Sequence, residues 1–315
     1  MFLPSYWGNK GHAVKMPHVE STRDINTLFV GSSRTQFHID PIVFDSITGT
    51  TKSFNLGYSS TRGEESMFFI EDLLSDKALL RSIDYIFLEV RPLFFDELLY
   101  KTLRGKYQLN KDRVMFLQSY FQPINKFATK DLSKAYVESL LGIGTLREEW
   151  CQLVVPSLRL TENIAFVGRR GFSNRKQAIE NDDMNSKLVK AGEGFVDKLA
   201  ERKAFAIQCY SSDNVTISTS DSLYISRLTQ LYNSLSKQGV QLYFIPTLRF
   251  ENTNLPSLFN KMPNGYLFSN TSNPLLYPDL YAPEFSGDAA HLNSSGAILY
   301  STILAELFLS INGPL

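Results

Sequence analysis

The stretch that decides the fold is Asn26-Thr-Leu-Phe-Val-Gly-Ser-Ser33. It begins with a short apolar run, which is typical of a buried strand, and ends in Gly31-Ser-Ser33, which is typical of a tight turn. Glycine allows the backbone to change direction sharply at such a point. The residues from Arg34 to His38 then continue as a helix or a loop. The stretch therefore predicts a strand whose carboxyl end presents serine side chains.

The same alternation of strand and helix extends outward from this stretch. Short apolar runs predict three more strands, at 53–57, 83–90 and 240–245. Apolar residues at helical spacing predict helices at 64–79, 222–238 and 294–311. Strands that alternate with helices are typical of a parallel sheet with helices on both faces. We therefore expect a three-layer α/β domain.

The chain length of 315 residues is common for a single α/β domain, so we expect one domain over 1–315. Residues 1–24 contain proline, glycine and polar side chains, and we expect an extended lead-in there. The strand pattern fades between about 96 and 220, where helices are expected at 132–141 and 192–206. We interpret this part as a mostly helical insertion that forms a cap or a wall near the carboxyl edge of the sheet.

The charge balance argues against a nucleic-acid-binding protein. Lys plus Arg and Asp plus Glu both number 32, so the formal net charge is zero. A broad basic face that neutralises many phosphates is therefore not expected. The two cysteines, Cys151 and Cys209, form no Cys-x-x-Cys or Cys/His cluster, so we expect no structural zinc and no other bound metal. Whether these two cysteines pair is left open.

The sequence has no uninterrupted apolar run of about 18 residues, so we expect no membrane span. The first 20 residues lack the apolar core of a signal peptide. They fit either a native start or a chain that follows a removed anchor.

Candidate catalytic residues lie at the two ends of the predicted sheet domain. Asp288 and His291 are three residues apart, just before the last predicted helix. A carboxylate at this spacing can hold the imidazole Nδ1–H and leave Nε2 as a base, although a capping aspartate beside a surface histidine has the same spacing. Ser33 ends the first strand, and in a doubly wound sheet these two places can meet at one edge. A serine hydroxyl needs such a base to become a nucleophile.

These motifs, in this order, resemble the SGNH (GDSL-type) hydrolase superfamily. Its first block corresponds to Gly31-Ser-Ser33, its second to Asn55-Leu-Gly57 and its last to Asp288-Ala-Ala-His291. The resemblance covers about residues 25–95 and 220–312. It implies a flavodoxin-like three-layer sandwich with a parallel sheet, which is the SGNH-hydrolase fold.

The resemblance also implies the role of each site residue. Ser33 would be the nucleophile, His291 the general base and Asp288 the group that orients the histidine. The N–H groups of Ser33 and Gly57 would form the oxyanion hole, in which one donor typically contributes about 3 kcal/mol. Arg34, Asn55 and Tyr58 are expected to contact substrate, and for Arg34 the anchoring of a carboxylate is the alternative. No metal and no organic cofactor is implied.

One block departs from the family pattern. The third block usually supplies an asparagine, whereas here the corresponding strand ends in Leu88-Glu-Val-Arg-Pro92. Glu89 could not donate to an oxyanion while ionised. Arg91 could donate, or Glu89 and Arg91 could simply pair.

The Gly-Ser-Ser-Arg form of the first block resembles a cell-envelope branch of the family. Its members include the bacterial teichoic-acid D-alanylation and alginate O-acetylation proteins. This branch implies an esterase or O-acyltransferase that acts on acylated carbohydrate or envelope polymer. It also implies a location outside the bacterial cytoplasm, near the membrane. The alternative is an inactive module that binds polysaccharide or scaffolds a membrane acyltransferase. The missing asparagine favours the inactive module, and the intact Ser-His-Asp set favours the enzyme.

Two weaker signals have open interpretations. His38 lies five residues after Ser33, where it could approach the site or make only a structural hydrogen bond. The basic cluster at 168–176 could bind an anionic polymer or lipid headgroup, or form a solvated loop.

Overall fold

A computed structural model describes most of the chain. The described residues are 10–22, 24–93, 95, 100, 105–106, 108–125, 128–140, 170–173, 194–212, 217–250 and 255–313.

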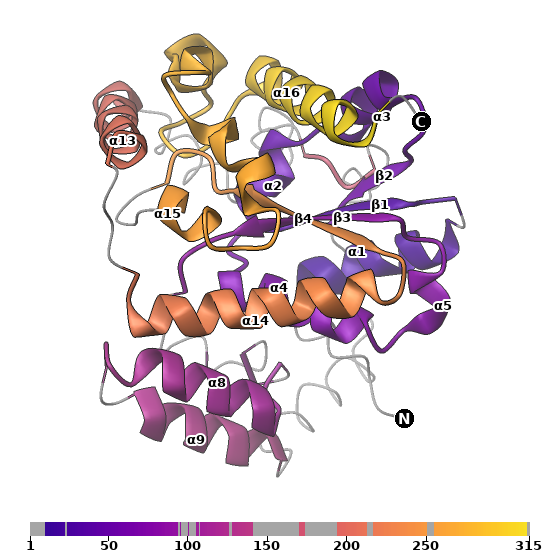
Figure 1. Ribbon diagram of the computed structural model, residues 1–315, viewed down its shortest axis with the longest axis vertical. Coiled ribbons are helices and arrows are strands. Elements are labelled where there is room, and N and C mark those ends of the chain that lie inside the picture. The colour runs from indigo at the N-terminus through magenta and orange to yellow at the C-terminus, as the bar shows by residue number, and fades with distance from the viewer. Residues whose placement is uncertain are drawn as a thin grey trace, which may run out of the picture.

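A four-stranded parallel sheet lies at the centre of the molecule (Figure 1). Its strands are β1 (Thr27–Val30), β2 (Ser53–Asn55), β3 (Tyr85–Val90) and β4 (Gln241–Pro246). Their order is β2-β1-β3-β4, and every neighbouring pair is parallel. The chain therefore moves to one side of β1 to form β2, and to the other side to form β3. This confirms the expected α/β class with a parallel sheet.

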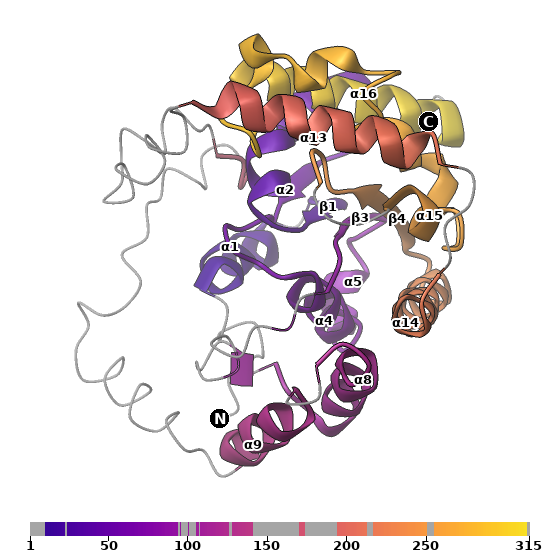
Figure 2. The same cartoon turned by 90° about the vertical axis from the view of Figure 1, so that its left-hand side faces the viewer.

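Helices from both halves of the chain lie on one face of the sheet, and two of them follow β1 directly. They include α2 (Ser33–His38), α3 (Pro41–Thr48), α13 (Phe195–Tyr210) and α16 (Ser294–Asn312) (Figures 1 and 2). Phe29 of β1 and Phe87 of β3 are register partners, and both are buried on this face. Phe44 of α3 and Phe308 of α16 pack onto them. This aromatic contact fixes α16 above the central strands.

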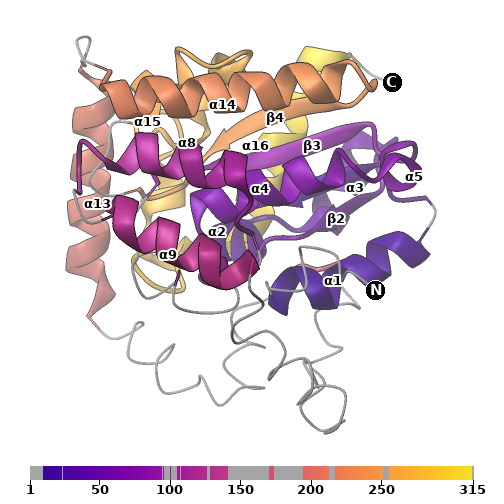
Figure 3. The same ribbon diagram turned by 90° about the horizontal axis from the view of Figure 1, so that it is seen from below.

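The opposite face carries α1 (Lys10–Ser21), α4 (Gly63–Leu73), α5 (Lys77–Leu80) and α14 (Thr219–Ser236), as Figure 3 shows from below. Leu28 and Val30 of β1 point into this second core, because successive side chains of a strand alternate between faces. The structure divides the helix predicted at 64–79 into α4 and α5, which are separated by a turn that ends at Asp76, the N-cap of α5. Outside α14 lie α8 (Lys111–Phe121) and α9 (Ala128–Leu140).

In the described parts of the insertion, α8, α9, α13 and the first residues of α14 are helical, whereas residues 170–173 form a turn. The contacts divide these helices between the two faces, with α8 against α14 and α13 against the segment after β4. That segment contains α15 (Leu255–Phe259) and the short 3-10 helices η4 (Gly265–Leu267), η5 (Ser269–Ser272), η6 (Pro278–Tyr281) and η7 (Pro283–Phe285).

The expectation of an extended lead-in at 1–24 is wrong for its second half, because Lys10–Ser21 is a helix. Pro17 lies inside it, where proline normally disfavours a helix. Tertiary contacts outweigh this cost, since Met16 and Val19 are buried in the core and Lys15 inserts into the domain. Residues 1–9 lie outside the described part of the chain.

Among the described helices, α16 alone has the length and mean hydropathy of a membrane span. The sequence criterion missed it because serine, threonine and Glu306 interrupt its apolar run. This is weak support for a span, since 44% of the tested window is buried inside the protein, as in a core helix.

Candidate active site

Ser33 lies at the point where the strand order of the sheet reverses. It is the first residue of α2, directly beyond the carboxyl end of β1 and beside β3. Ser32 caps this helix, and its hydroxyl accepts a hydrogen bond from the Arg34 N–H at 3.2 Å. Open parallel sheets bind ligands in the crevice at such a switch point. The local sequence therefore places a serine hydroxyl where a substrate would enter.

Ser33, His291 and Asp288 form a hydrogen-bonded chain. The distance from Ser33 Oγ to His291 Nε2 is 2.9 Å. The distance from His291 Nδ1 to Asp288 Oδ2 is also 2.9 Å. The Asp288 carboxylate is almost fully buried, whereas the His291 ring is 17% exposed. The structure thus brings together the three residues that the sequence singled out from opposite ends of the domain.

The Asp288–His291 turn is shaped by hydrogen bonds to its own backbone. Asp288 Oδ1 accepts from the N–H groups of Ala290, at 2.6 Å, and His291, at 2.8 Å. The carboxylate is therefore held before it meets the imidazole. The ring of Phe37 contacts the His291 ring edge-on at 5.4 Å, which limits rotation of the imidazole.

Arg249 supports the turn from beneath, and the sequence analysis missed it. Its side chain is fully buried and donates to the carbonyl oxygens of Leu280, Asp288 and His291 and to the Ser286 hydroxyl. Burial lowers the pKa of Arg249 to about 9. Most of its acceptors are backbone carbonyls, which every residue type supplies, so no sequence pattern could have indicated this role.

Glu89 lies beneath the turn that carries Ser33. Its carboxylate accepts from the Ser32 N–H at 2.7 Å, from the Thr35 hydroxyl at 2.8 Å and from the Thr247 hydroxyl at 3.1 Å. The Ser32 hydroxyl adds a further hydrogen bond at 2.8 Å. Burial alone would raise the pKa of Glu89, but Arg91, Arg34 and these hydrogen bonds outweigh it, and the pKa is lowered. Glu89 is therefore an ionised group that holds the turn carrying Ser33.

The predicted oxyanion hole is only partly present. The Ser33 N–H donates a hydrogen bond to no acceptor among the described residues. The Gly57 N–H, however, is donated to Asn55 Oδ1 at 2.8 Å, so the expectation that it faces an oxyanion is wrong for this conformation. The expected substrate contact of Asn55 is wrong as well. Its Nδ2 donates to the carbonyls of Thr35 and Ile39, and the whole side chain is buried.

Arg91 adopts the pairing that the sequence left open. Its Nε lies 4.0 Å from Glu89 Oε1, and its Nη1 donates to the Thr61 carbonyl at 2.8 Å. A role for Arg91 in the oxyanion hole therefore gains no support from its hydrogen bonds. Tyr58 is half-buried beside the site, and its N–H donates to the Gly31 carbonyl at 3.1 Å. Its predicted contact with substrate stays a prediction.

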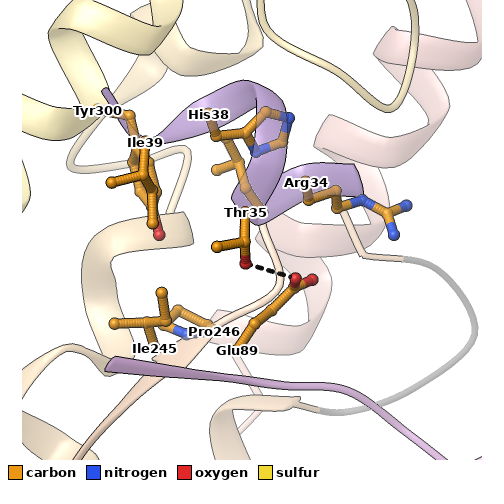
Figure 4. Close-up of a pocket in the computed structure, with 9 residues that line it drawn as sticks. Arg34, Thr35, His38, Ile39, Glu89, Ile245, Pro246 and Tyr300 are labelled. Atoms are coloured by element: carbon orange, nitrogen blue, oxygen red, sulfur yellow. Dashed lines mark hydrogen bonds between the residues drawn. The ribbon is translucent and has the colours of Figure 1, made fainter. Parts of the chain in front are cut away.

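His38 belongs to a small cavity beneath α2 rather than to the hydrogen-bonded chain (Figure 4). The cavity has room for about one water molecule, so it is too small to hold a substrate. Its lining comprises Arg34, Thr35, His38, Ile39, Glu89, Ile245, Pro246, Leu248 and Tyr300. Burial lowers the pKa of His38 well below its usual value, so this imidazole is neutral beside His291.

The described part of the basic cluster, residues 170–173, packs against the sheet. Arg170 pairs with Asp45, and its carbonyl accepts from the Asn55 N–H at 2.8 Å. The other cations of the cluster, Arg169, Arg175 and Lys176, lie outside the described residues, as does Cys151. Within the described ranges, no group of three or more His, Cys, Asp or Glu side chains is arranged to hold a metal ion.

Comparison of the chain with protein-family models, curated proteins and solved structures gave no match. The resemblance to the SGNH hydrolases therefore rests on the sequence motifs alone.

Proposed function

We propose that the protein is a serine-dependent ester hydrolase or O-acyltransferase with the SGNH-hydrolase fold. The hydrogen-bonded chain Ser33–His291–Asp288, at the switch point of a parallel sheet, is the observation that carries this proposal. The resemblance adds the substrate class, which is acylated carbohydrate or cell-envelope polymer. It also adds a location outside the bacterial cytoplasm, near the membrane.

The geometry supports a two-step acyl transfer. Ser33 Oγ attacks the ester carbonyl carbon while His291 Nε2 accepts the hydroxyl proton. Asp288 keeps the other ring nitrogen protonated and stabilises the imidazolium. The Ser33 N–H donates to the developing oxyanion. His291 then returns the proton to the leaving alcohol, and water or a sugar hydroxyl releases the acyl group from Ser33.

A second candidate function follows from the occupied Gly57 N–H. The Gly57 N–H donates to Asn55 Oδ1. Of the two backbone N–H groups predicted for the oxyanion hole, the described site therefore keeps only that of Ser33 available. A weak oxyanion hole is typical of a site with little catalytic power. The alternative is therefore an inactive module that binds polysaccharide or scaffolds a membrane acyltransferase.

Labelling by a fluorophosphonate probe distinguishes the two functions. The probe reacts with a serine that a neighbouring base activates. We expect the wild-type protein and the control variant Ser46→Ala, whose serine is exposed on α3, to label equally. We expect Ser33→Ala to show no label and to hydrolyse 4-nitrophenyl acetate more than about a thousandfold more slowly. A wild-type protein that neither labels nor hydrolyses the ester would favour the binding module.

A further inference from the structure

Arg34 is a half-buried cation, and no hydrogen bond links its guanidinium to the described residues. It directly follows Ser33 in α2, and its Nε is buried with no hydrogen-bond partner among the described residues. A buried donor without a partner costs free energy, and more so when it is charged. Figure 4 shows the Arg34 side chain extending away from Ile245 and Tyr300, so it does not fill the cavity beneath α2.

Among the described residues, the carboxylate that acts on Arg34 is Glu89, whose oxygens already accept other hydrogen bonds. Glu89 lowers the electrostatic cost of the guanidinium, but the oxygens of Glu89 accept from Ser32, Thr35 and Thr247. The cation closest to Glu89 is Arg91, at 4.0 Å. Arg34 is therefore not the ion-pair partner around which this carboxylate is organised.

A second guanidinium increases the positive charge at the same place. Arg202 of α13 donates to the Ala289 carbonyl at 3.2 Å, between Asp288 and His291. Arg202 and Arg91 both act on Arg34 as like charges. The remaining neighbour is Tyr281, which is neutral near pH 7 because burial raises the pKa of its phenol. The whole chain has no net charge. Among the described residues around Ser33, four arginines stand against two carboxylates, namely Arg34, Arg91, Arg202 and Arg249 against Glu89 and Asp288.

We propose that Arg34 binds an oxyanion, a carboxylate or a phosphate, that the ester substrate carries close to its scissile bond. A guanidinium presents five N–H donors in a planar fork that matches both anions. The proposal rests on the ester chemistry proposed for Ser33 and adds the charge class of the substrate. The anion can belong to the acyl group, as in a dicarboxylate half-ester, or to the alcohol, as in an acylated polyol phosphate.

Two pairs of esters test the proposal. The first pair is 4-nitrophenyl hemisuccinate and 4-nitrophenyl acetate, which differ by a carboxylate on the acyl side. The second pair is 1-acetylglycerol 3-phosphate and 1-acetylglycerol, which differ by a phosphate on the alcohol side. In at least one pair, we expect Arg34→Gln to lower the ratio of kcat/KM, charged over neutral, by about tenfold or more. Arg34→Lys should keep part of the ratio, because it retains the charge and loses the fork.

Arg81→Gln is the matched control, because Arg81 is an exposed arginine at the end of α5. It should leave both ratios unchanged. The pair whose ratio falls in Arg34→Gln identifies the source of the anion. If Arg34→Gln lowers kcat/KM equally for the charged and the neutral ester of both pairs, Arg34 acts on Ser33 rather than on a substrate anion, and the proposal is wrong.

A binding measurement separates this proposal from the proposed chemistry. Ser33→Ala cannot form an acyl-enzyme but keeps Arg34, so its melting temperature should rise with inorganic phosphate or succinate at constant ionic strength. The rise should be absent in Ser33→Ala/Arg34→Gln. Equal shifts in both proteins would overturn the role of Arg34. A wild-type protein that hydrolyses no ester, while these shifts differ as expected, would overturn the chemistry and leave anion binding at Arg34 supported.

Discussion

Glu89 occupies the place at which the family resemblance expects an asparagine, and its environment shows why a carboxylate is suited to it. Its two oxygens face donors from Ser32, Thr35 and Thr247, and Arg91 supplies a positive charge. An amide can accept through one oxygen only and would direct its NH₂ group at these donors. The carboxylate therefore fixes the turn that begins α2, and through it the position of the Ser33 hydroxyl.

We expect Glu89→Gln to lower kcat by about tenfold and to lower the free energy of unfolding by about 2 kcal/mol, because it removes hydrogen bonds to a buried charged group. KM should change little, since Glu89 is only 3% exposed and acts on substrate through Ser33 alone. Steady-state kinetics and urea unfolding measure these effects. The exposed Glu306→Gln is the control. A rise in KM without a fall in kcat would show that Glu89 does not act by positioning the serine.

The candidate catalytic residues could be found from the sequence because their places are set by element boundaries. Ser33 follows a strand and the Asp288–His291 turn precedes a helix, so chain topology brings them to one edge. The expectation for Asn55 fails for a local reason. Its amide oxygen binds the N–H two residues further on, a frequent habit of asparagine in turns, and this removes the Gly57 donor.

At the scale of elements, the buried Lys15 adds hydrogen bonds to the apolar contacts of Met16 and Val19 that hold α1 on the domain. Lys15 Nζ donates to the carbonyls of Asn55 at 3.0 Å, Gly57 at 2.6 Å and Gly171 at 2.8 Å. Its three acceptors belong to two segments that are far apart in sequence. Lys15 thus connects α1, the end of β2 and residues 170–173.

We expect Lys15→Met to lower the free energy of unfolding by about 3 kcal/mol, because three carbonyl groups lose their donor. Relative to the wild type, this variant should also show a larger increase in amide hydrogen exchange in α1 than in α14. Urea unfolding and hydrogen exchange measure the two effects. Lys77→Met is the control, since Lys77 is exposed on α5. If the two variants are equally stable, the contacts of Lys15 do not hold α1 in place.

The strands and the last helix were predictable to within a few residues, because amphipathic or uniformly apolar patterns set their limits, whereas α3 was not predicted. The last helix, expected at 294–311, is Ser294–Asn312, and the fourth strand, expected at 240–245, is Gln241–Pro246. The helix α1 was not predictable. It contains Pro17, which argues against a helix. It is also stabilised by Lys15, which is buried in the domain, although a lysine in a sequence is normally expected on the surface.

At the scale of the whole molecule, alternation of strands and helices predicted the parallel sheet, but not the order of its strands. Two buried groups on the α1 and α4 side also give stability a dependence on pH that a net charge of zero would not suggest. Burial lowers the pKa of Lys15 to about 7 and raises the pKa of Glu64 to about 7. Lys15 makes the protein more stable as pH rises above 7, because the unfolded chain then binds the proton more tightly.

Glu64 has the opposite effect at lower pH, and it can be isolated by substitution. Its Oε2 is buried without a hydrogen-bond partner in the described residues, while its Oε1 accepts from the Tyr100 hydroxyl at 3.3 Å. Between about pH 4.5 and 7 the folded protein holds the Glu64 proton and the unfolded chain does not, so this contribution to stability is lost as pH rises through 7.

We expect Glu64→Gln, which stays neutral, to gain about 3 kcal/mol in free energy of unfolding relative to wild type between pH 4.5 and 8. Urea unfolding of both proteins across this range measures the difference, and a constant difference at all pH values would mean that Glu64 does not titrate as its burial requires.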